Sequence, residues 1–322
     1  MSRIDFWLIS NTVNKENVTV KILPTPLTDH KAIELILNFS DKKHSFYSPS
    51  YWKMNSSLLQ FEEVSASIST LLNQYWSKAH VDARYNLNWE LFKFEAGKFL
   101  RKFSSNRIKT IRAEENYIIS RNVEMSYSNP STLSDLKQQE LAELQIKLDN
   151  IYINKSKGAF VRSRKKWMEE GEQNTHYFFN LEKHNAVNNS ISRLKINNST
   201  TDNPDNIAKY CCSFYENLYR SNLCQASIDS LLNNLTVKPI SNFDQKRCEE
   251  PITIHEILDA IAHLKTNKSP GTDGLSAEFY KNFSNNLAPF LLEVFNESIK
   301  NVSLPATLRQ GLTTLIPKPN KN

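Results

Sequence analysis

Six basic residues gather in a stretch of this chain that contains no acidic residue. They are Lys155, Lys157, Arg162, Arg164, Lys165 and Lys166, and Phe160 and Trp167 are interleaved with them. Basic side chains can follow a nucleic-acid backbone, because each neutralised phosphate releases condensed counterions, and aromatic rings can stack on bases. We interpret residues 155–167 as a candidate surface for RNA or single-stranded DNA, with a solvated helix face as the alternative.

A second basic run falls at helical spacing further upstream, and for it we favour the solvated helix face. Its members are Lys93, Lys98, Arg101, Lys102, Arg107, Lys109 and Arg112. Cysteine offers no stronger signal. The residues Cys211, Cys212, Cys224 and Cys248 contain no Cys-x-x-Cys pair and have no well-spaced histidines, so reduced structural thiols are favoured over a zinc site.

A tight turn lies between two helical patterns near the C-terminal end. Residues 268–275 read KSPGTDGL, which places a proline, two glycines and a turn-forming aspartate beside Lys268. The backbone must leave the preceding helix here and turn sharply. Taken alone, this pattern is also typical of an ordinary helix-to-helix connection.

The longer pattern resembles a known family. KSPGTDGL, then EFYK at residues 278–281 and LIPKP at 315–319, is similar to the start of the reverse transcriptase domain of LINE-type (non-LTR) retrotransposons. SRIDFWLIS at residues 2–10 and LTDHKAI at 27–33 resemble the last strands of the endonuclease/exonuclease/phosphatase fold of the same polyproteins. The segment 164–182 is similar to the element that precedes their polymerase. These three patches occur in the family's order.

The resemblance implies four regions. Residues 1–40 correspond to the C-terminal remnant of the endonuclease domain, and 41–157 to a helical linker region. Residues 158–250 correspond to a basic helical element before the polymerase, and 251–322 to the N-terminal part of the reverse transcriptase, truncated before its palm. The match at 39–157 rests on position and helical character alone.

In the endonuclease fold, a histidine near the last strand activates water or contacts the scissile phosphate. The resemblance assigns this role to His30, its orientation to Asp5, and support of a divalent metal or the water to Asp29. An Asp-His pair in an exposed loop is the structural alternative. The family's remaining metal and phosphate ligands come from earlier in that domain, so we expect this remnant to be inactive.

The reverse transcriptase region implies binding without catalysis. Two-metal phosphoryl transfer needs clustered carboxylates around two Mg²⁺ ions, and this chain contains no Asp-Asp pair. Mg²⁺ belongs to the complete family enzyme, and we expect no stably bound cofactor here. The resemblance places Lys268, Gly271, Asp273 and Lys318 on the fingers side, where amides and lysines position template and nucleotide phosphates.

The formal net charge of +6 suggests a polyanionic partner, although an excess of this size is also common in proteins that have none. Among the 322 residues, 39% are apolar, which can supply real cores, and only six are glycine, which favours long helices. No apolar run approaches a membrane span, and the first residues lack a signal-peptide core. We therefore expect an intracellular protein without membrane contact, and the oligomeric state stays open.

Periodicity predicts an α+β fold that is predominantly α. We expect strands at 4–10, 18–23 and 32–39, with a hairpin turn at 11–17. Helical stripes begin at residues 61 and 89, and Asn88 is a candidate N-cap for the second. After a break at 126–130, a capping box at 132–135 predicts a return helix with Leu136, Leu144, Leu148 and Ile151 on its apolar face, giving an antiparallel pair of long helices.

The second half of the sequence alternates short elements. We expect a strand at 191–196, a helix from Pro204, an irregular stretch at 221–244 around a short helix, and a capped helix from Thr253. Beyond the loop, apolar residues from Phe279 to Ile299 predict two helical pieces of a fingers-like region. A short strand at 312–316 ends the pattern.

We therefore expect a fragment of a polyprotein whose complete form performs target-primed reverse transcription. This chain is expected to bind RNA or single-stranded DNA through Arg162, Arg164, Lys165, Lys166, Trp167 and the Lys268 loop, without catalysing either reaction of the complete protein. One alternative is an inert translated remnant. Another is a residual metal-dependent nuclease that uses His30.

Overall fold

The computed structural model describes most of the helical part of the chain. The described residues are 7–10, 18–24, 31–37, 51–126, 135–163, 191, 193–196, 199–221, 224–236 and 238–315. Of residues 21–24, 31, 32, 156, 157, 159–163 and 247 only the backbone is described. The chain divides into two units, Met1–Phe46 with Asn106–Ile191 and Leu315–Asn322, and Tyr47–Ser105 with Ser192–Thr314. Each unit is considered by itself.

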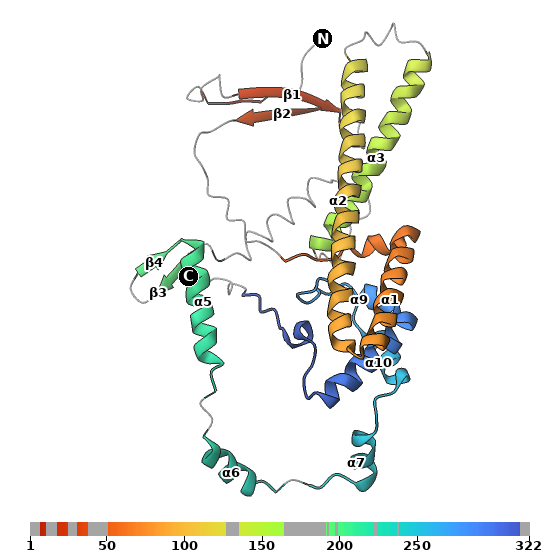
Figure 1. The fold of residues 1–322 in the computed structure, drawn as a ribbon. Helices are drawn as coiled ribbons and strands as arrows, with labels where there is room; N and C mark the ends of the chain where they lie inside the picture. The colour runs from red at the N-terminus through yellow and green to blue at the C-terminus, as the bar shows by residue number, and fades with distance from the viewer. Residues whose placement is uncertain are drawn as a thin grey trace. The chain divides into compact units, whose positions relative to one another are not determined.

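The first unit contains a β-hairpin. β1 (Val18–Pro24) pairs antiparallel with β2 (Lys31–Leu37), with Val18 opposite Leu37 and Pro24 opposite Lys31 (Figure 1). These strands confirm two of the three that the sequence predicted. The strand expected at 4–10 is wrong in its described part, because residues 7–10 form no strand; the Trp7 indole Nε1 donates to the Ile33 carbonyl at 2.8 Å. The turn expected at 11–17 lies outside the described residues.

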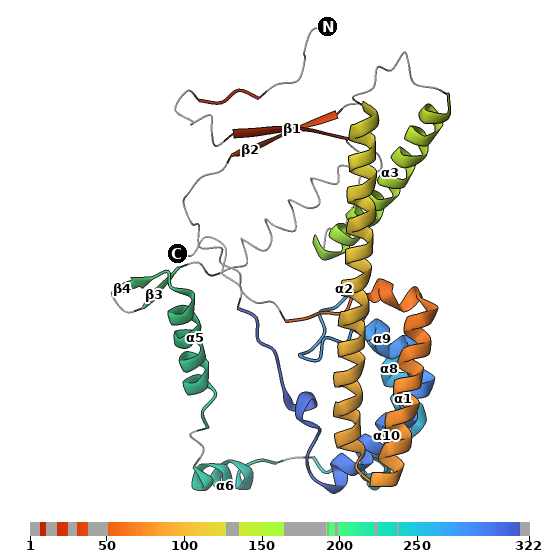
Figure 2. The same cartoon turned by 45° about the horizontal axis from the view of Figure 1, so that its top comes forward.

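Two long helices confirm the predicted antiparallel pair. α2 (Tyr85–Ser126) and α3 (Asp135–Ser163) lie side by side along the second half of α2 (Figures 1 and 2). Ion pairs fix the antiparallel direction: Arg121 Nε lies 2.9 Å from Glu140 Oε1, and Lys155 Nζ lies 2.5 Å from Glu115 Oε2. The seam between the helices buries Ile118, Met125, Leu144 and Leu148.

One residue predicted for the apolar face of α3 is not buried against α2. Leu136, in the first turn of α3, is exposed and does not belong to the buried seam with α2. The capping box predicted at 132–135 lies outside the described residues, apart from Asp135, where α3 begins.

The second unit packs helices from two distant stretches of sequence around one core. They are η2 (Ser56–Gln60), α1 (Glu62–Asp82), the first half of α2, α8 (Ile254–His263), α9 (Ala277–Asn282) and α10 (Ser284–Lys300). Trp89 and Phe290 meet edge to face with ring centroids 5.4 Å apart, and Phe92 and Leu287 are fully buried beside them. The stretch expected as a linker therefore supplies half of the core that holds the C-terminal helices.

Local sequence explains how several of these helices begin. The Thr253 hydroxyl accepts from the Glu256 amide while the Glu256 carboxylate accepts from the Thr253 amide, so the predicted capping box of α8 is confirmed. The prediction for Asn88 was wrong. α2 begins at Tyr85, where the Asn86 amide is capped by Glu297 of α10 at 2.8 Å, and Asn88 lies buried inside the helix.

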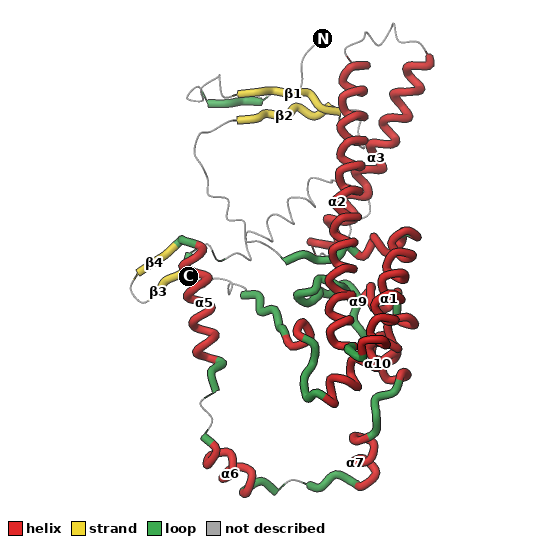
Figure 3. The backbone as a smooth tube through the Cα atoms, in the orientation of Figure 1, coloured by secondary structure: helices red, strands yellow, loops and turns green. Residues whose placement is uncertain are grey.

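Short elements lie between the two halves of this core in sequence. They are β3 (Leu194–Ile196), β4 (Ser199–Thr201), α5 (Pro204–Leu218), α6 (Gln225–Asn233) and α7 (Asn242–Glu249) (Figure 3). α5 and α6 were predicted, whereas α7 begins inside the stretch that was expected to be irregular. Ser241 caps it by accepting from the Asp244 amide at 3.1 Å.

The end of the described chain differs from the prediction. η4 (Ala306–Arg309) is followed by residues 310–315, which form no strand, so the strand expected at 312–316 is wrong in its described part. An extended segment needs a hydrogen-bonded neighbour to become a strand, and the described residues provide none here. No helix in the described ranges is both long and apolar enough to cross a bilayer.

Candidate nucleic-acid interface

The loop at residues 264–276 is held against the segment that precedes α1. The Met54 amide donates to the Gly274 carbonyl at 2.9 Å. Gly274 has a φ of 76°, and a Cβ at this position would lie 2.3 Å from Trp52 Cε3 and 2.5 Å from the Trp52 carbonyl oxygen. Only glycine fits here, because a side chain would strain the backbone and collide with Trp52.

Further hydrogen bonds fix the turn itself. The Gly274 amide donates to the Gly271 carbonyl at 3.1 Å, and the Leu275 amide donates to Asp273 Oδ1 at 3.1 Å. The Tyr51 hydroxyl reaches the Pro270 carbonyl at 2.9 Å. The loop is therefore ordered by its own turn chemistry and by the aromatic residues beneath it.

At the start of the loop, Glu278 of α9 accepts a 2.6 Å hydrogen bond from the Asn267 amide. Burial opposes ionisation of Glu278, but the hydrogen bond from the Asn267 amide and the positive charge of Lys281 favour the carboxylate, and the pKa of Glu278 lies below its ordinary value. Asn267 has a φ of 57°, a left-handed conformation that asparagine tolerates. The ionised carboxylate thus holds a backbone turn.

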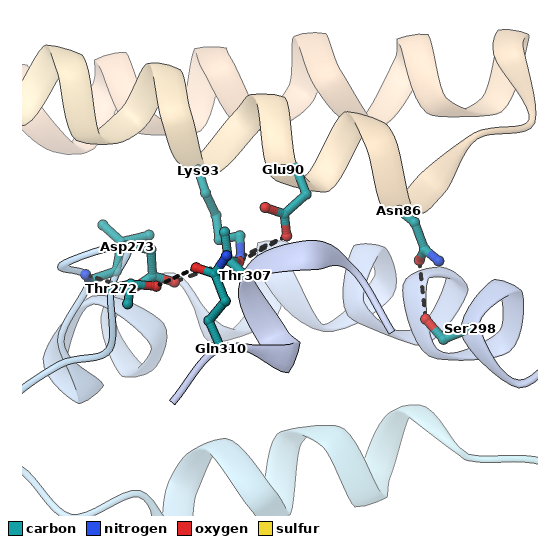
Figure 4. Close-up of polar contacts among 9 residues, drawn as sticks. Asn86, Glu90, Lys93, Thr272, Asp273, Ser298, Thr307 and Gln310 are labelled. Atoms are coloured by element: carbon teal, nitrogen blue, oxygen red, sulfur yellow. Dashed lines mark hydrogen bonds and ion pairs between the residues drawn. The ribbon is translucent and has the colours of Figure 1, made fainter. Parts of the chain in front are cut away.

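A buried lysine anchors the other side of the loop. Lys93 of α2 is 3% exposed, and its ammonium lies 3.1 Å from Glu90 Oε1 and 3.7 Å from Asp273 Oδ2 (Figure 4). It also donates to the Thr307 hydroxyl, which in turn donates to Glu90 at 2.9 Å. The prediction that Lys93 lies on a solvated face was wrong. The Lys93 ammonium is buried and connects Asp273 of the loop to Thr307 of the η4 turn.

The carboxylates of this buried cluster affect a neighbouring tyrosine. Burial, followed by the negative charges of Asp273 and Glu90, raises the pKa of Tyr280 above its ordinary range. Tyr280 therefore stays a neutral phenol and adds no charge to the cluster. Among the described residues, the charged groups of this buried cluster are Lys93, Glu90 and Asp273.

Cations occupy the outer side of the loop. Lys265 and Lys268 are exposed, and Lys268 has no acidic partner within the described part of the chain. Beside the loop, the Arg101 guanidinium lies 5.1 Å from the centre of the Trp52 ring, and Lys53 Nζ lies 4.9 Å from that of Tyr51. We call Lys53, Arg101 and Lys268 the outer cations.

The described charges around the loop differ in burial and in their partners. Asp273, Glu90 and Glu278 each have at least one carboxylate oxygen that binds an ammonium, a hydroxyl or a backbone amide of the protein. The outer cations are exposed to solvent. Exposed cations of this kind can bind phosphates, because neutralisation of a polyanion releases its condensed counterions.

A comparison with known proteins gives one clear similarity. The chain is 28% identical over 323 residues to the "Transposon TX1 uncharacterized 149 kDa protein" of Xenopus laevis. This chain resembles a transposon protein. The alignment covers 98% of this chain and 24% of the relative, so the chain spans about a quarter of that protein's length. No protein-family model matches. The similarity supports the interpretation as part of a retrotransposon polyprotein.

Several predicted site residues lie where the structure gives no description. Asp5, Asp29, His30 and Lys318 are among them, as are Arg164, Lys165, Lys166 and Trp167. Arg162 lies in the last turn of α3, with its side chain undescribed. Among the described residues, no three His, Cys, Asp or Glu side chains gather as a metal site.

The basic stretch at 155–167 is partly compensated. Lys155 belongs to this stretch, and its Nζ forms an ion pair with Glu115 Oε2 of the facing helix at 2.5 Å. The expectation of an uncompensated cluster is therefore wrong for this member. Antiparallel packing brought an acidic residue from forty positions upstream.

Sequence reasoning missed Tyr51 and Trp52, which lie more than two hundred positions before the loop they contact, and Lys53 beside them. For Lys93 a signal was present. It falls four residues after Trp89 and three before Ala96, on the same helical face as the predicted core stripe. A lysine on such a face is expected to meet a buried acid.

Proposed function

We propose that this chain is a segment of a non-LTR retrotransposon polyprotein whose complete form performs target-primed reverse transcription. Within it, the loop at 264–276 and the outer cations bind RNA or single-stranded DNA, and this segment catalyses neither cleavage nor polymerisation. The basic stretch ending at Trp167 adds a second contact. The similarity to the transposon protein and the resemblance of KSPGTDGL and LIPKP support this assignment.

The separation of charge around the loop carries the proposal for binding. A surface lysine has little significance alone, because exposed lysines are common. Here the loop that presents Lys268 is fixed by a required glycine, an internal carboxylate turn and two aromatic residues. A rigid loop loses little conformational freedom on binding, so its contacts with phosphate are realised more fully.

Fluorescence anisotropy over a salt series tests the proposal, with a labelled structured RNA and a single-stranded DNA as probes. We expect dissociation constants of roughly micromolar at low salt. Replacing the three outer cations with alanine should weaken binding and reduce the log-log salt slope by roughly 2, at about 0.7 per lost phosphate contact. A second variant replaces Arg162, Arg164, Lys165 and Lys166 with alanine and measures the separate contribution of that stretch.

A matched control removes the same charge elsewhere in the unit. Lys78, Arg84 and Lys300 are exposed, and they lie near the end of the unit where α1 turns into α2 and Ser298 of α10 bonds to Asn86. Their replacement with alanine should leave the slope nearly unchanged. Equal losses of affinity and of salt slope in the two triple variants would mean that net charge alone drives binding, and they would contradict binding at the loop. No binding by a folded chain would favour the inert remnant.

A further inference from the structure

We infer that Lys93 is a positioning residue for the proposed interface. Lys93 holds the loop and the η4 turn in one fixed arrangement and touches no ligand itself. The expected effect on nucleic-acid affinity rests on the proposed function, whereas the role in holding the loop does not. The contacts that carry it are independent of any ligand. Figure 4 shows the lysine reaching from α2 toward residues of both segments.

The environment of Lys93 suits a structural anchor. Its side chain is 2% exposed, so its charge has left bulk water and requires close partners. Those partners come from three segments: Glu90 of α2, Asp273 of the loop and Thr307 of η4. The Trp89 ring centre lies 5.7 Å from the ammonium and covers another side. An ammonium so enclosed cannot reach a phosphate in solvent.

The loop and η4 also contact each other beside this lysine. The Thr272 hydroxyl donates to Gln310 Oε1 at 3.4 Å, next to Asp273 and close to Thr307 (Figure 4). That exposed bond is long and weak. Lys93 reaches from α2 to both segments, and the bond between Thr307 and Glu90 is a second polar link between η4 and α2.

Loss of the lysine has a defined consequence for the loop. Asp273 would lose its cationic partner and face Glu90, since both are carboxylates beside the vacated site. Two unpaired acids repel each other, so Asp273 should turn toward solvent and loosen the turn that its Oδ1 holds through the Leu275 amide. Lys268 stays on the chain but is no longer held in one place.

The test compares Lys93→Met with Lys268→Ala in the full chain, by anisotropy with the same single-stranded DNA over a salt series. Lys268→Ala removes a phosphate contact, so it should lower the salt slope by roughly 0.7. Lys93→Met should weaken binding about tenfold at every salt concentration with the slope unchanged, because loop order is lost and no phosphate contact is removed.

A double variant asks whether Lys93 acts through Asp273. In Lys93→Met, the further change Asp273→Asn removes the unpaired charge, and it should restore part of the affinity or leave it unchanged. Additive weakening would contradict coupling between the two residues. Thr307→Val is a milder variant that keeps the ion pairs, and it should weaken binding less than Lys93→Met does.

Hydrogen exchange separates failure of this inference from failure of the proposed function. In Lys93→Met, the Gly274 and Leu275 amides should exchange at least tenfold faster, while amides of the α8 interior keep their protection. This result would support positioning even if the wild-type chain bound no nucleic acid. Unchanged loop exchange, or a changed salt slope, would overturn the role. Equal acceleration throughout the unit would show a general stabilising residue and would also overturn it.

Discussion

Replacing Gly274 with alanine should release the loop from the residues beneath it. At a φ of 76°, a non-glycine residue costs about 1–2 kcal/mol. The added Cβ would lie 2.3 Å from Trp52 Cε3 and 2.5 Å from the Trp52 carbonyl oxygen, and relief of such overpacking costs a further 1–3 kcal/mol, roughly. Together these costs predict a loss of about 2–5 kcal/mol, and a backbone oxygen cannot move aside as a flexible side chain would.

Urea unfolding and hydrogen exchange together measure this effect. The Met54 amide bonds to the Gly274 carbonyl, so its exchange reports directly on contact between the loop and the underlying segment. Gly311→Ala is the matched control, because its Cβ would meet no atom within 4 Å. The control should change the free energy of unfolding little. If Gly274→Ala matched the control in both measurements, the close approach of Gly274 to Trp52 would be refuted.

Three further changes test the structure around the interface. Thr253→Ala removes the capping box with Glu256 and should destabilise α8 by about 1 kcal/mol in urea unfolding. Glu278 has a lowered pKa, so its ionised form contributes stability above its ordinary pKa that is lost as pH falls through the folded value. Glu278→Gln should therefore flatten the fall in unfolding free energy below about pH 4.5, measured by urea titration at each pH. Phe290→Ala should cost about 3–5 kcal/mol and expose α1 and α10 amides together, because one core joins them.

Periodic apolar residues made much of the helical fold predictable. The stripes that begin at Phe61 and Trp89 became α1 and α2, and the break near Ser126 became the end of α2. The failures concern long-range context. Local sequence does not tell whether a terminal segment finds a strand to pair with. It also does not tell that Glu297 of α10 caps α2, because both depend on segments far away in sequence.

The candidate interface was predictable only in part for the same reason. The turn chemistry of the loop correctly located Gly271, Asp273 and an exposed Lys268 on one connection between helices. Asp273, however, faces inward to Lys93, and the aromatic support comes from Tyr51 and Trp52. Local sequence can define the shape of a turn, but the tertiary fold decides which of its side chains remain accessible.

Mapped photocrosslinking to RNA tests the central claim most directly. An RNA that contains 4-thiouridine would be irradiated with the purified chain, and the crosslinked peptides identified by mass spectrometry. The account predicts crosslinks in peptides that contain Tyr51, Lys53 or Lys268, and their loss in the variant without the outer cations. Crosslinks confined to other surfaces, or unaffected by that variant, would contradict the assignment of this loop as the nucleic-acid interface.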